Sequence, residues 1–289
     1  MQCTTVLPHP RGAAPADARP RVGPPASRSN CCVHPSTATA PARAAPDWLV
    51  DEPFEHTTVG TVKSGKEAEV FLVERRYAGG STVLLAHKRY RPRRPSRGEL
   101  RELGFAQGTI YHNKSAYHAG WHLASRDRRA VERHTDHGRD VVEGMWPIQE
   151  MAVLERAWAA GASVPYPVER TDDGVIMEFI GDREQAAPRL AQARLSAAEV
   201  ASACRQLMAS VRALTAAGLV HADLSAYNLL WWRGRLVVID LPQAVEFSTN
   251  TDAPSLLHRD LENVAAWFVR HHVIVDVERE FAELLALVW

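Results

Sequence analysis

Two aspartates and one asparagine have the types and the spacing that chemistry on a phosphate group requires. Asp223 and Asn228 lie five residues apart in "HADLSAYN", and Asp240 follows the apolar run "LVVI". Residues 229–232 and 236–239 read as two strands joined by a tight turn, which returns Asp240 to the side of Asn228. Carboxylate and amide oxygens gathered at one strand end suit Mg²⁺. The segment therefore predicts a magnesium site.

Other residues supply the remaining parts of a phosphoryl-transfer site. Such a site needs a cation on the phosphates, a group that holds this cation, and a loop that covers the phosphates. Lys88 lies in the apolar segment "TVLLAHKRY", and Glu150 lies in the first turns of the helix predicted to follow. The turn Ser64-Gly65-Lys66 can point backbone N–H groups at phosphates. Each of these features alone is common in proteins. Their occurrence together, in this order along the chain, predicts a phosphoryl-transfer site.

A second segment, "HRDLEN", competes for the role of catalytic loop. In an ordinary kinase an asparagine lies five residues after the catalytic aspartate, whereas Ala265 is five residues after Asp260 and Asn263 only three. We therefore predict that Asp260 is structural, capping or salt-bridging a helix. We likewise interpret His221 as a packed histidine that braces the catalytic loop, with a role as a base as the alternative.

The periodicity of apolar residues predicts the elements that position these side chains. "HTTVGTVKSGKEAEVFLVERR" reads as strand, glycine turn and strand, and "TVLLAHKRY" and "DGVIMEFIGD" as two further strands. "WPIQEMAVLERAWAAG" predicts a helix that ends at Gly161. "LSAAEVASACRQLMASVRALTAAG" predicts a long helix with a capping box at Ser196 and Glu199 and a stop at Gly218. "DLENVAAWFVRHH" and "VEREFAELLALVW" predict two closing helices.

Two sets of apolar residues are expected to face the core. The half-buried face of the first strands should carry Val59, Val62, Val70, Leu72 and Val73. The buried stripe of the helix that follows should carry Ile148, Met151, Leu154, Ala157 and Trp158.

Composition narrows the class of protein. Formal net charge is zero over 289 residues, so no global field favours nucleic acid or membrane. The four cysteines follow neither a disulfide nor a zinc pattern, and no apolar run is long enough to span a membrane. We expect a cytoplasmic protein without membrane contact.

The chain divides by composition into a tail and two lobes. Residues 1–46 hold nine prolines, five arginines and one acidic residue, so we expect a disordered tail, with an organelle transit peptide as the alternative. The order of the predicted elements, strands first and helices later, predicts an α+β fold with two lobes. Residues 47–179 form an N-lobe of antiparallel sheet plus one helix, with a charged insert at about 91–144. Residues 180–289 form a helical C-lobe.

The sequence resembles the RIO family of atypical protein kinases. The segments that carry the resemblance appear in the family's order: "SGKEAEVF", "AHKRY", "WPIQEMAVLERAWAAGASVPYP", "MEFIGD", "VHADLSAYNLL" and "VIDLPQAVE". "HRDLENVAAWF" is similar to the family's closing helix.

The resemblance implies a role for each site residue. Asp223 is the catalytic aspartate, which orients the acceptor hydroxyl or accepts its proton. Asn228 and Asp240 hold magnesium, and Lys88 contacts the ATP phosphates while paired with Glu150. A further set contacts the nucleotide: Ser64, Gly65 and Lys66 cover the triphosphate, and Glu178 and Ile180 offer backbone groups to adenine.

The resemblance also implies an activity, cofactors and partners. The activity is that of a serine/threonine protein kinase that phosphorylates itself or another protein, or that of an ATPase in which Asp240 accepts the phosphoryl group. The cofactors are ATP and Mg²⁺, with Mn²⁺ as a substitute. The fold that the resemblance implies is that of a protein kinase with a reduced helical C-lobe. "LPQAV" follows Asp240 where ordinary kinases have phenylalanine-glycine, and neither an activation loop nor an A-P-E segment follows. How a protein substrate docks is therefore open.

A basic run lies next to Lys88. Its cations from Arg89 to Arg101 fit either a contact with RNA of a ribosomal subunit or a solvated loop. Three aromatic residues follow that could stack on bases or pack the loop, and three serines are candidate autophosphorylation sites. These residues are Tyr111, Tyr117, Trp121, Ser96, Ser115 and Ser125.

Two rival functions share the same motif. A small-molecule phosphotransferase of the antibiotic type also uses H-x-D-x-x-x-x-N and a later aspartate, but it commonly has a larger helical lobe for its acceptor. A nucleotide-gated ribosome-assembly factor would bind ATP with little turnover. The filled catalytic positions favour an enzyme over this second rival.

Overall fold

The computed structural model describes residues 43–65, 68–91 and 136–288. These residues belong to one compact unit, Pro41–Trp289. The expected disordered tail lies almost wholly outside the described residues. The same holds for Lys66, most of the basic run, and the aromatic and serine candidates that follow it.

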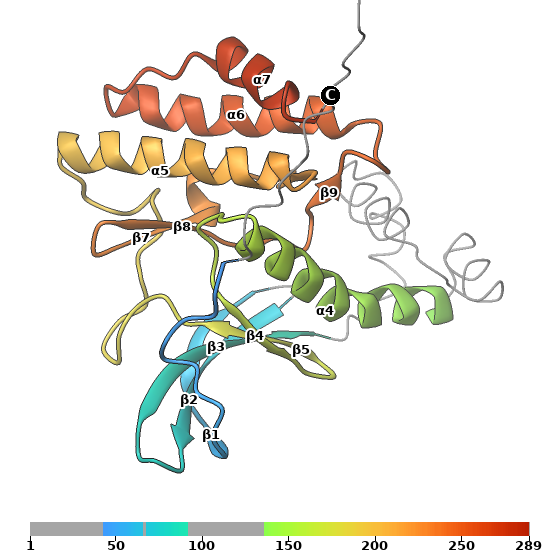
Figure 1. Ribbon diagram of the computed structural model, residues 1–289, viewed down its shortest axis with the longest axis vertical. Helices are drawn as coiled ribbons and strands as arrows, with labels where there is room; N and C mark the ends of the chain where they lie inside the picture. Colours follow the sequence, from blue (N-terminus) through green and yellow to red (C-terminus); the bar gives the residue numbers. More distant parts are fainter. Residues whose placement is uncertain (1–42, 66–67, 92–135, 289) are drawn as a thin grey trace, which may run out of the picture. The chain divides into compact units, whose positions relative to one another are not determined.

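A five-stranded antiparallel sheet forms the first lobe, in the order β1-β2-β3-β5-β4 (Figure 1). The strands are β1 (Phe54–Ser64), β2 (Ala68–Tyr77), β3 (Thr82–Tyr90), β4 (Pro167–Arg170) and β5 (Gly174–Glu178). Four of them were predicted, and β4 was not. Pro167 is the first residue of β4, and because β4 lies at the edge of the sheet, the missing N–H of this proline breaks no ladder inside the sheet.

The two faces of this sheet have different partners. On one face Val73, Leu85 and Ile176 form a small buried cluster that Trp48 helps to cover. The other face carries Lys88, directly opposite Val70 on β2 and Val175 on β5. The predicted burial of Val59 is wrong, since this side chain is 53% exposed. Its strand lies at the edge of the sheet and pairs only with β2.

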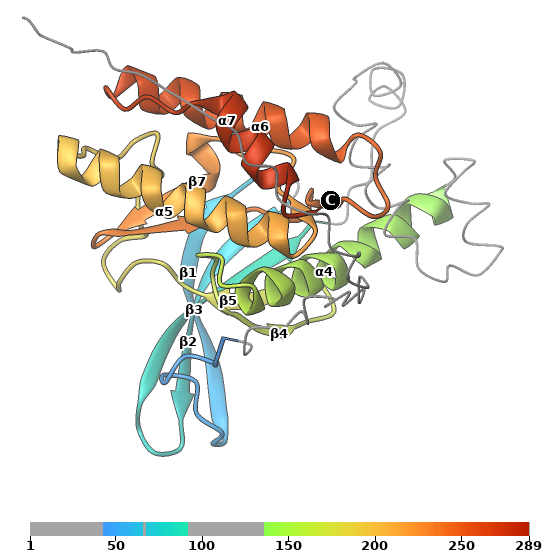
Figure 2. The same ribbon diagram turned by 45° about the horizontal axis from the view of Figure 1, so that its top comes forward.

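Helix α4 (Asp136–Ala159) packs against β4, β5 and β3 (Figure 2). It begins inside the predicted charged insert, about ten residues earlier than expected, and Pro147 lies within it rather than near its start. Glu150 therefore lies in the second half of the helix, not in its first turns. The predicted stripe holds for Leu154, Ala157 and Trp158 but fails for Ile148, which is 52% exposed.

The C-lobe consists of three helices and two small antiparallel sheets, β6-β9 and β7-β8. Its elements are α5 (Ala197–Ala216), β6 (Leu219–Val220), the 3₁₀ turn η2 (Ala226–Asn228), β7 (Leu229–Trp232), β8 (Arg235–Val238), β9 (Val245–Glu246), α6 (Ala253–Arg270) and α7 (Val277–Leu285). Helix α7 packs against both α5 and α6. The predicted two-lobed α+β fold is confirmed.

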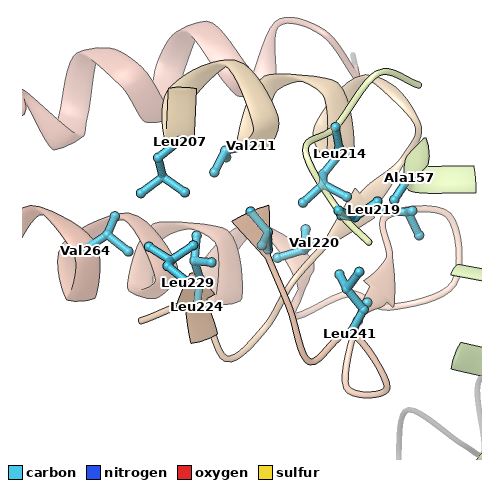
Figure 3. Packing of buried hydrophobic residues seen from close by; sticks show 14 of the residues in the cluster. Ala157, Leu207, Val211, Leu214, Leu219, Val220, Leu224, Leu229, Leu241 and Val264 are labelled. Carbon is cyan, nitrogen blue, oxygen red and sulfur yellow. The ribbon is translucent and has the colours of Figure 1, made fainter. Parts of the chain in front are cut away.

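The main core lies between α5 and the strands of the catalytic segment. Leu207, Val211 and Leu214 of α5 point toward Leu219 and Leu229 (Figure 3). The capping box predicted for α5 is present at its N-terminus, and the helix ends before Gly218, whose φ of 74° suits glycine. This core therefore supports the loop that carries Asp223.

No helix among the described residues is both long enough and apolar enough to cross a membrane.

Candidate active site

The hairpin β7-β8 brings the three predicted magnesium-site residues to one place. Arg233 and Gly234 form its two-residue turn, both with positive φ, as tight hairpins require. The hairpin leads back to Ile239, whose N–H donates to the carbonyl oxygen of Asn228 at 3.0 Å. Asp240 follows immediately, with a φ of 69°. As predicted, Asp240 returns beside Asn228.

Asn228 also fixes the loop on its other side. Its buried amide nitrogen donates to the Asp223 carbonyl oxygen at 2.8 Å and to the Asp223 carboxylate at 3.1 Å. The Asp223 side chain is exposed. The loop thus presents a carboxylate to solvent while its backbone is held.

His221 is buried and braces the loop, as predicted. Its Nε2 lies 3.0 Å from the carbonyl oxygen of Ile239, and its Nδ1 accepts from the Asp223 N–H at 3.3 Å. Since a carbonyl can only accept, Nε2 carries the proton in this arrangement. The ring joins the catalytic loop to the strand before Asp240.

The motif "HRDLEN" forms an anchor on α6. The Asp260 carboxylate is 1% exposed and accepts from the N–H groups of Ala222 and Leu224 at 2.7 and 2.8 Å. Arg259 donates to the Ala222 carbonyl oxygen. Asp260 is structural, as predicted, but its partners are backbone groups of the catalytic loop rather than a helix end or a cation. Burial raises the pKa of its carboxyl group.

Replacing Asp260 with alanine is expected to destabilise the protein and to disorder the catalytic loop. Two buried N–H groups lose their acceptor, at about 1–3 kcal/mol each, and Ala222 keeps a strained φ of 66°. Chemical denaturation and amide hydrogen exchange of residues 222–224 measure both effects. Asp252→Ala is the matched control, because its carboxylate makes no capping hydrogen bond at the start of the same helix. Equal stability of the two variants would contradict the anchor.

Lys88 joins the two lobes. Its ammonium group lies 2.7 Å from Glu150 of α4 and 3.0 Å from Asp240 of the C-lobe. The second oxygen of Glu150 accepts a hydrogen bond from Tyr90, two residues along β3 on the same face. Glu150 is 2% exposed, so its charge is balanced inside the protein. The predicted pair of Lys88 with Glu150 is present.

Electrostatics favour the charged forms of this cluster. Burial alone would lower the pKa of Lys88, but the carboxylates of Glu150 and Asp240 outweigh burial and raise that pKa. Burial alone would raise the pKa of Asp240, but the charge and the hydrogen bond of Lys88 outweigh burial, so the pKa of Asp240 is lowered. An ammonium group fixed in this way can hold a phosphate without losing its proton.

The predicted phosphate-covering turn is differently engaged. The Gly65 N–H donates to the carbonyl oxygen of Ala68 at 2.9 Å and so closes the turn. This N–H is therefore not directed at a ligand. The Ser64 hydroxyl donates to Glu69 at 3.2 Å and accepts from Arg91 at 2.7 Å. Gly65 does line the pocket between the lobes.

A pocket of about 710 Å³ lies between the lobes. Lys88, Glu150 and Asp240 line it, together with the predicted adenine-contact residues Glu178 and Ile180. Neither Asp223 nor Asn228 is among its lining residues. Sequence reasoning missed two further cations of its wall, Lys63 and Arg189, as well as Tyr90. Only Tyr90 had a local signal, the strand spacing of two from Lys88.

Existing hydrogen bonds restrict how the connector between the lobes can meet a ligand. The Glu178 N–H donates to Tyr166 and the Ile180 carbonyl accepts from Ala187. The Glu178 N–H and the Ile180 carbonyl are therefore already engaged within the protein. The Glu178 side chain pairs with Arg235 of β8 at 2.6 Å, which fixes the connector to the C-lobe.

The described part of the basic run is already neutralised. Arg89 pairs with Asp173 at 3.4 Å, and Arg91 pairs with Glu69. A contact with ribosomal RNA through Arg89–Arg101 remains a prediction, and it depends mainly on residues outside the described ranges.

The predicted metal ligands supply oxygen donors. No group of three His, Cys, Asp or Glu side chains able to hold a metal occurs within the described ranges. The predicted ligands are a carboxylate, Asp240, and an amide oxygen, Asn228, with the Asp223 carboxylate next to Asn228. Such a set, completed by water or phosphate oxygens, fits Mg²⁺.

Comparison with known proteins decides the family. The family model described as "RIO domain" matches residues 110–281, more than half of the chain. The chain belongs to the RIO domain family. The match includes Glu150, the connector, the catalytic loop and α6, while β1 to β3 with Lys88 precede it.

Several curated relatives are similar to this RIO domain. The RIO-type serine/threonine-protein kinase Rio1 of Haloferax volcanii is 40% identical over 141 residues, 48% of this chain and 47% of the relative. The serine/threonine-protein kinase RIO3 of Homo sapiens is 38% identical over 125 residues, 43% of this chain and 24% of the relative. The serine/threonine-protein kinase RIO1 of Chaetomium thermophilum is 29% identical over 224 residues, 74% of this chain and 40% of the relative. The matched region spans less than half of each relative.

Proposed function

We propose that this RIO domain transfers the γ-phosphoryl group of ATP to a serine or threonine hydroxyl, of another protein or of itself. The observation that carries the proposal is Lys88, held by Glu150 and Asp240 in the wall of a 710 Å³ pocket between the lobes. This lysine–glutamate pair, beside a metal-binding aspartate, is what kinases use to hold ATP phosphates. The names of the relatives support the same activity.

Each step has a residue to perform it. The adenine ring lies among the apolar side chains of the pocket, with its edge against the Glu178 carbonyl and the Ile180 N–H. Lys88 contacts the phosphates. Asp223 orients the acceptor hydroxyl and takes its proton as the oxygen–phosphorus bond forms and ADP leaves.

Asn228 and Asp240 are the proposed ligands of Mg²⁺, for which Mn²⁺ can substitute. The ion supplies charge neutralisation at the phosphate oxygens. Asp240 is also the proposed acceptor in an ATPase cycle, in which its carboxylate takes the phosphoryl group and water then removes it. Membership of the RIO family favours a protein acceptor, or Asp240 itself, over a small-molecule acceptor.

Metal removal tests the proposal. The purified full chain is expected to bind ATP and to release or transfer the γ-phosphoryl group with Mg²⁺, and to lose turnover in EDTA. The measurement follows γ-labelled ATP, with ATP binding measured separately by calorimetry. No binding would refute the nucleotide site. Binding with no turnover at any metal concentration would indicate a nucleotide-gated assembly factor instead of an enzyme.

A further inference from the structure

Two cations of the pocket wall stand apart from the paired charges around them. Lys63 and Arg189 both line the pocket, and neither has an ion-pair partner in the part of the chain that the structure describes. Lys88, in contrast, contacts two carboxylates, and Arg235 contacts Glu178. Two of the three cations that line the pocket thus lack a carboxylate partner within the described residues, which points to an anionic ligand.

The register of the sheet places Lys63 in line with Lys88. Lys63 on β1 lies opposite Val70 on β2, and Val70 lies opposite Lys88 on β3. Directly opposite residues share a face of a sheet, so the two lysines face the pocket in one row. Two strand spacings separate them, about 10 Å. A ligand that reaches both must therefore be extended, as a polyphosphate is.

Arg189 reaches the pocket from the opposite lobe. Its backbone forms a β-bridge with Leu230, which also lines the pocket, and its side chain is partly buried. Burial, followed by repulsion from Arg189 and Lys88, lowers the pKa of Lys63, whereas Asp240 opposes this effect. These like charges come from different lobes, so an anion between them removes a repulsion and joins the lobes.

Charge balance shows why Lys88 alone is insufficient. Lys88 brings one positive charge against the two negative charges of Glu150 and Asp240. This cluster is net negative and by itself repels a polyphosphate, even before metal is considered. Since the N–H of Gly65 and the hydroxyl of Ser64 already have protein partners, the predicted turn supplies little compensation among the described residues.

We propose that Lys63 and Arg189, which line the pocket from opposite lobes, together bind the polyphosphate of the nucleotide as a cation pair. This inference rests on the proposed function and deepens it. The pair acts on charge and not on the base, so it discriminates ATP and ADP from adenosine.

The test uses calorimetric titration of the full chain with adenosine, ADP and ATP. Lys63→Gln and Arg189→Gln are each expected to weaken ATP binding about tenfold, equivalent to about 1.4 kcal/mol, with adenosine binding unchanged. The loss should shrink at high salt, because screening weakens the same attraction in the wild type. Lys63→Arg should keep wild-type affinity. Arg270→Gln, at the exposed end of α6, is the charge-matched control and should change nothing.

The outcomes distinguish failure of the cation pair from failure of the proposed nucleotide site. Wild-type ATP affinity in both glutamine variants overturns the cation pair and leaves the nucleotide site intact. An equal loss for adenosine and ATP also overturns it, because the residues would then shape the pocket and not bind phosphate. Failure of the wild type to bind ATP removes the proposed function itself.

Discussion

Replacing Asp223 with asparagine is expected to reduce phosphoryl transfer by about 10²–10⁴-fold, the usual contribution of a positioned base. The fold should survive, because this side chain is exposed and its hydrogen bond comes from the Asn228 amide. Asp240→Asn should cause a loss at least as large, since it removes the proposed metal ligand and the acceptor of an ATPase cycle. Asparagine is the suitable replacement there, because it tolerates the positive φ of Asp240 better than alanine.

The label left on the protein separates the two activities. A hydroxylamine-labile label that disappears in Asp240→Asn indicates an aspartyl-phosphate and hence an ATPase cycle. A hydroxylamine-stable label on serine indicates a protein kinase. Asp252→Asn, an exposed carboxylate at the start of α6, serves as the control. Wild-type turnover in Asp223→Asn would refute the assignment of the catalytic loop.

Local sequence signals predicted the catalytic segment well. The turn at Arg233-Gly234 fixes the hairpin, and the hairpin places Asp240 beside Asn228. All the residues that determine this position lie within a short stretch of chain. The capping box of α5 is equally local. The pairing of Lys88 with Glu150, which are 62 residues apart, was predicted from the parts that a phosphoryl-transfer site needs, and the resemblance to the RIO family implied the same pair. No local pattern joins these two residues.

The failures have physical causes. The first ten residues of α4 are rich in charge and contain two glycines, which weaken the helix signal, so the helix was predicted to start only at Trp146. Lys63 and Arg189 belong to no motif, and only the packing of two lobes brings them to one pocket. Asp260 was recognised as structural, but its partners depend on α6 crossing behind the catalytic loop. Such contacts between distant segments leave no periodic trace in a sequence.

Replacing Lys88 with methionine is expected to abolish turnover and also to destabilise the protein. The buried carboxylate of Glu150 would lose its cation, and removing one partner of a buried ion pair lowers the free energy of unfolding by about 3–5 kcal/mol. Tyr90 still donates a hydrogen bond to Glu150 but does not neutralise it. Urea denaturation measures the stability, and turnover of γ-labelled ATP is measured where circular dichroism shows the variant folded.

A double-mutant cycle separates the structural role of Lys88 from its chemical role. Glu150→Gln removes the buried negative charge but keeps the shape of the side chain, so Lys88→Met with Glu150→Gln should be more stable than Lys88→Met alone. Turnover should not return in the double variant, because the phosphates still lack the lysine. Stability that stays at the Lys88→Met level would mean that the ion pair is not what the substitution breaks. Stability that recovers together with turnover would place the lysine in the fold alone. Recovered stability without turnover is the result expected of a phosphate-binding lysine. In that case the stability of the fold depends on the ion pair between Lys88 and Glu150, whereas turnover depends on the contact of Lys88 with the phosphates.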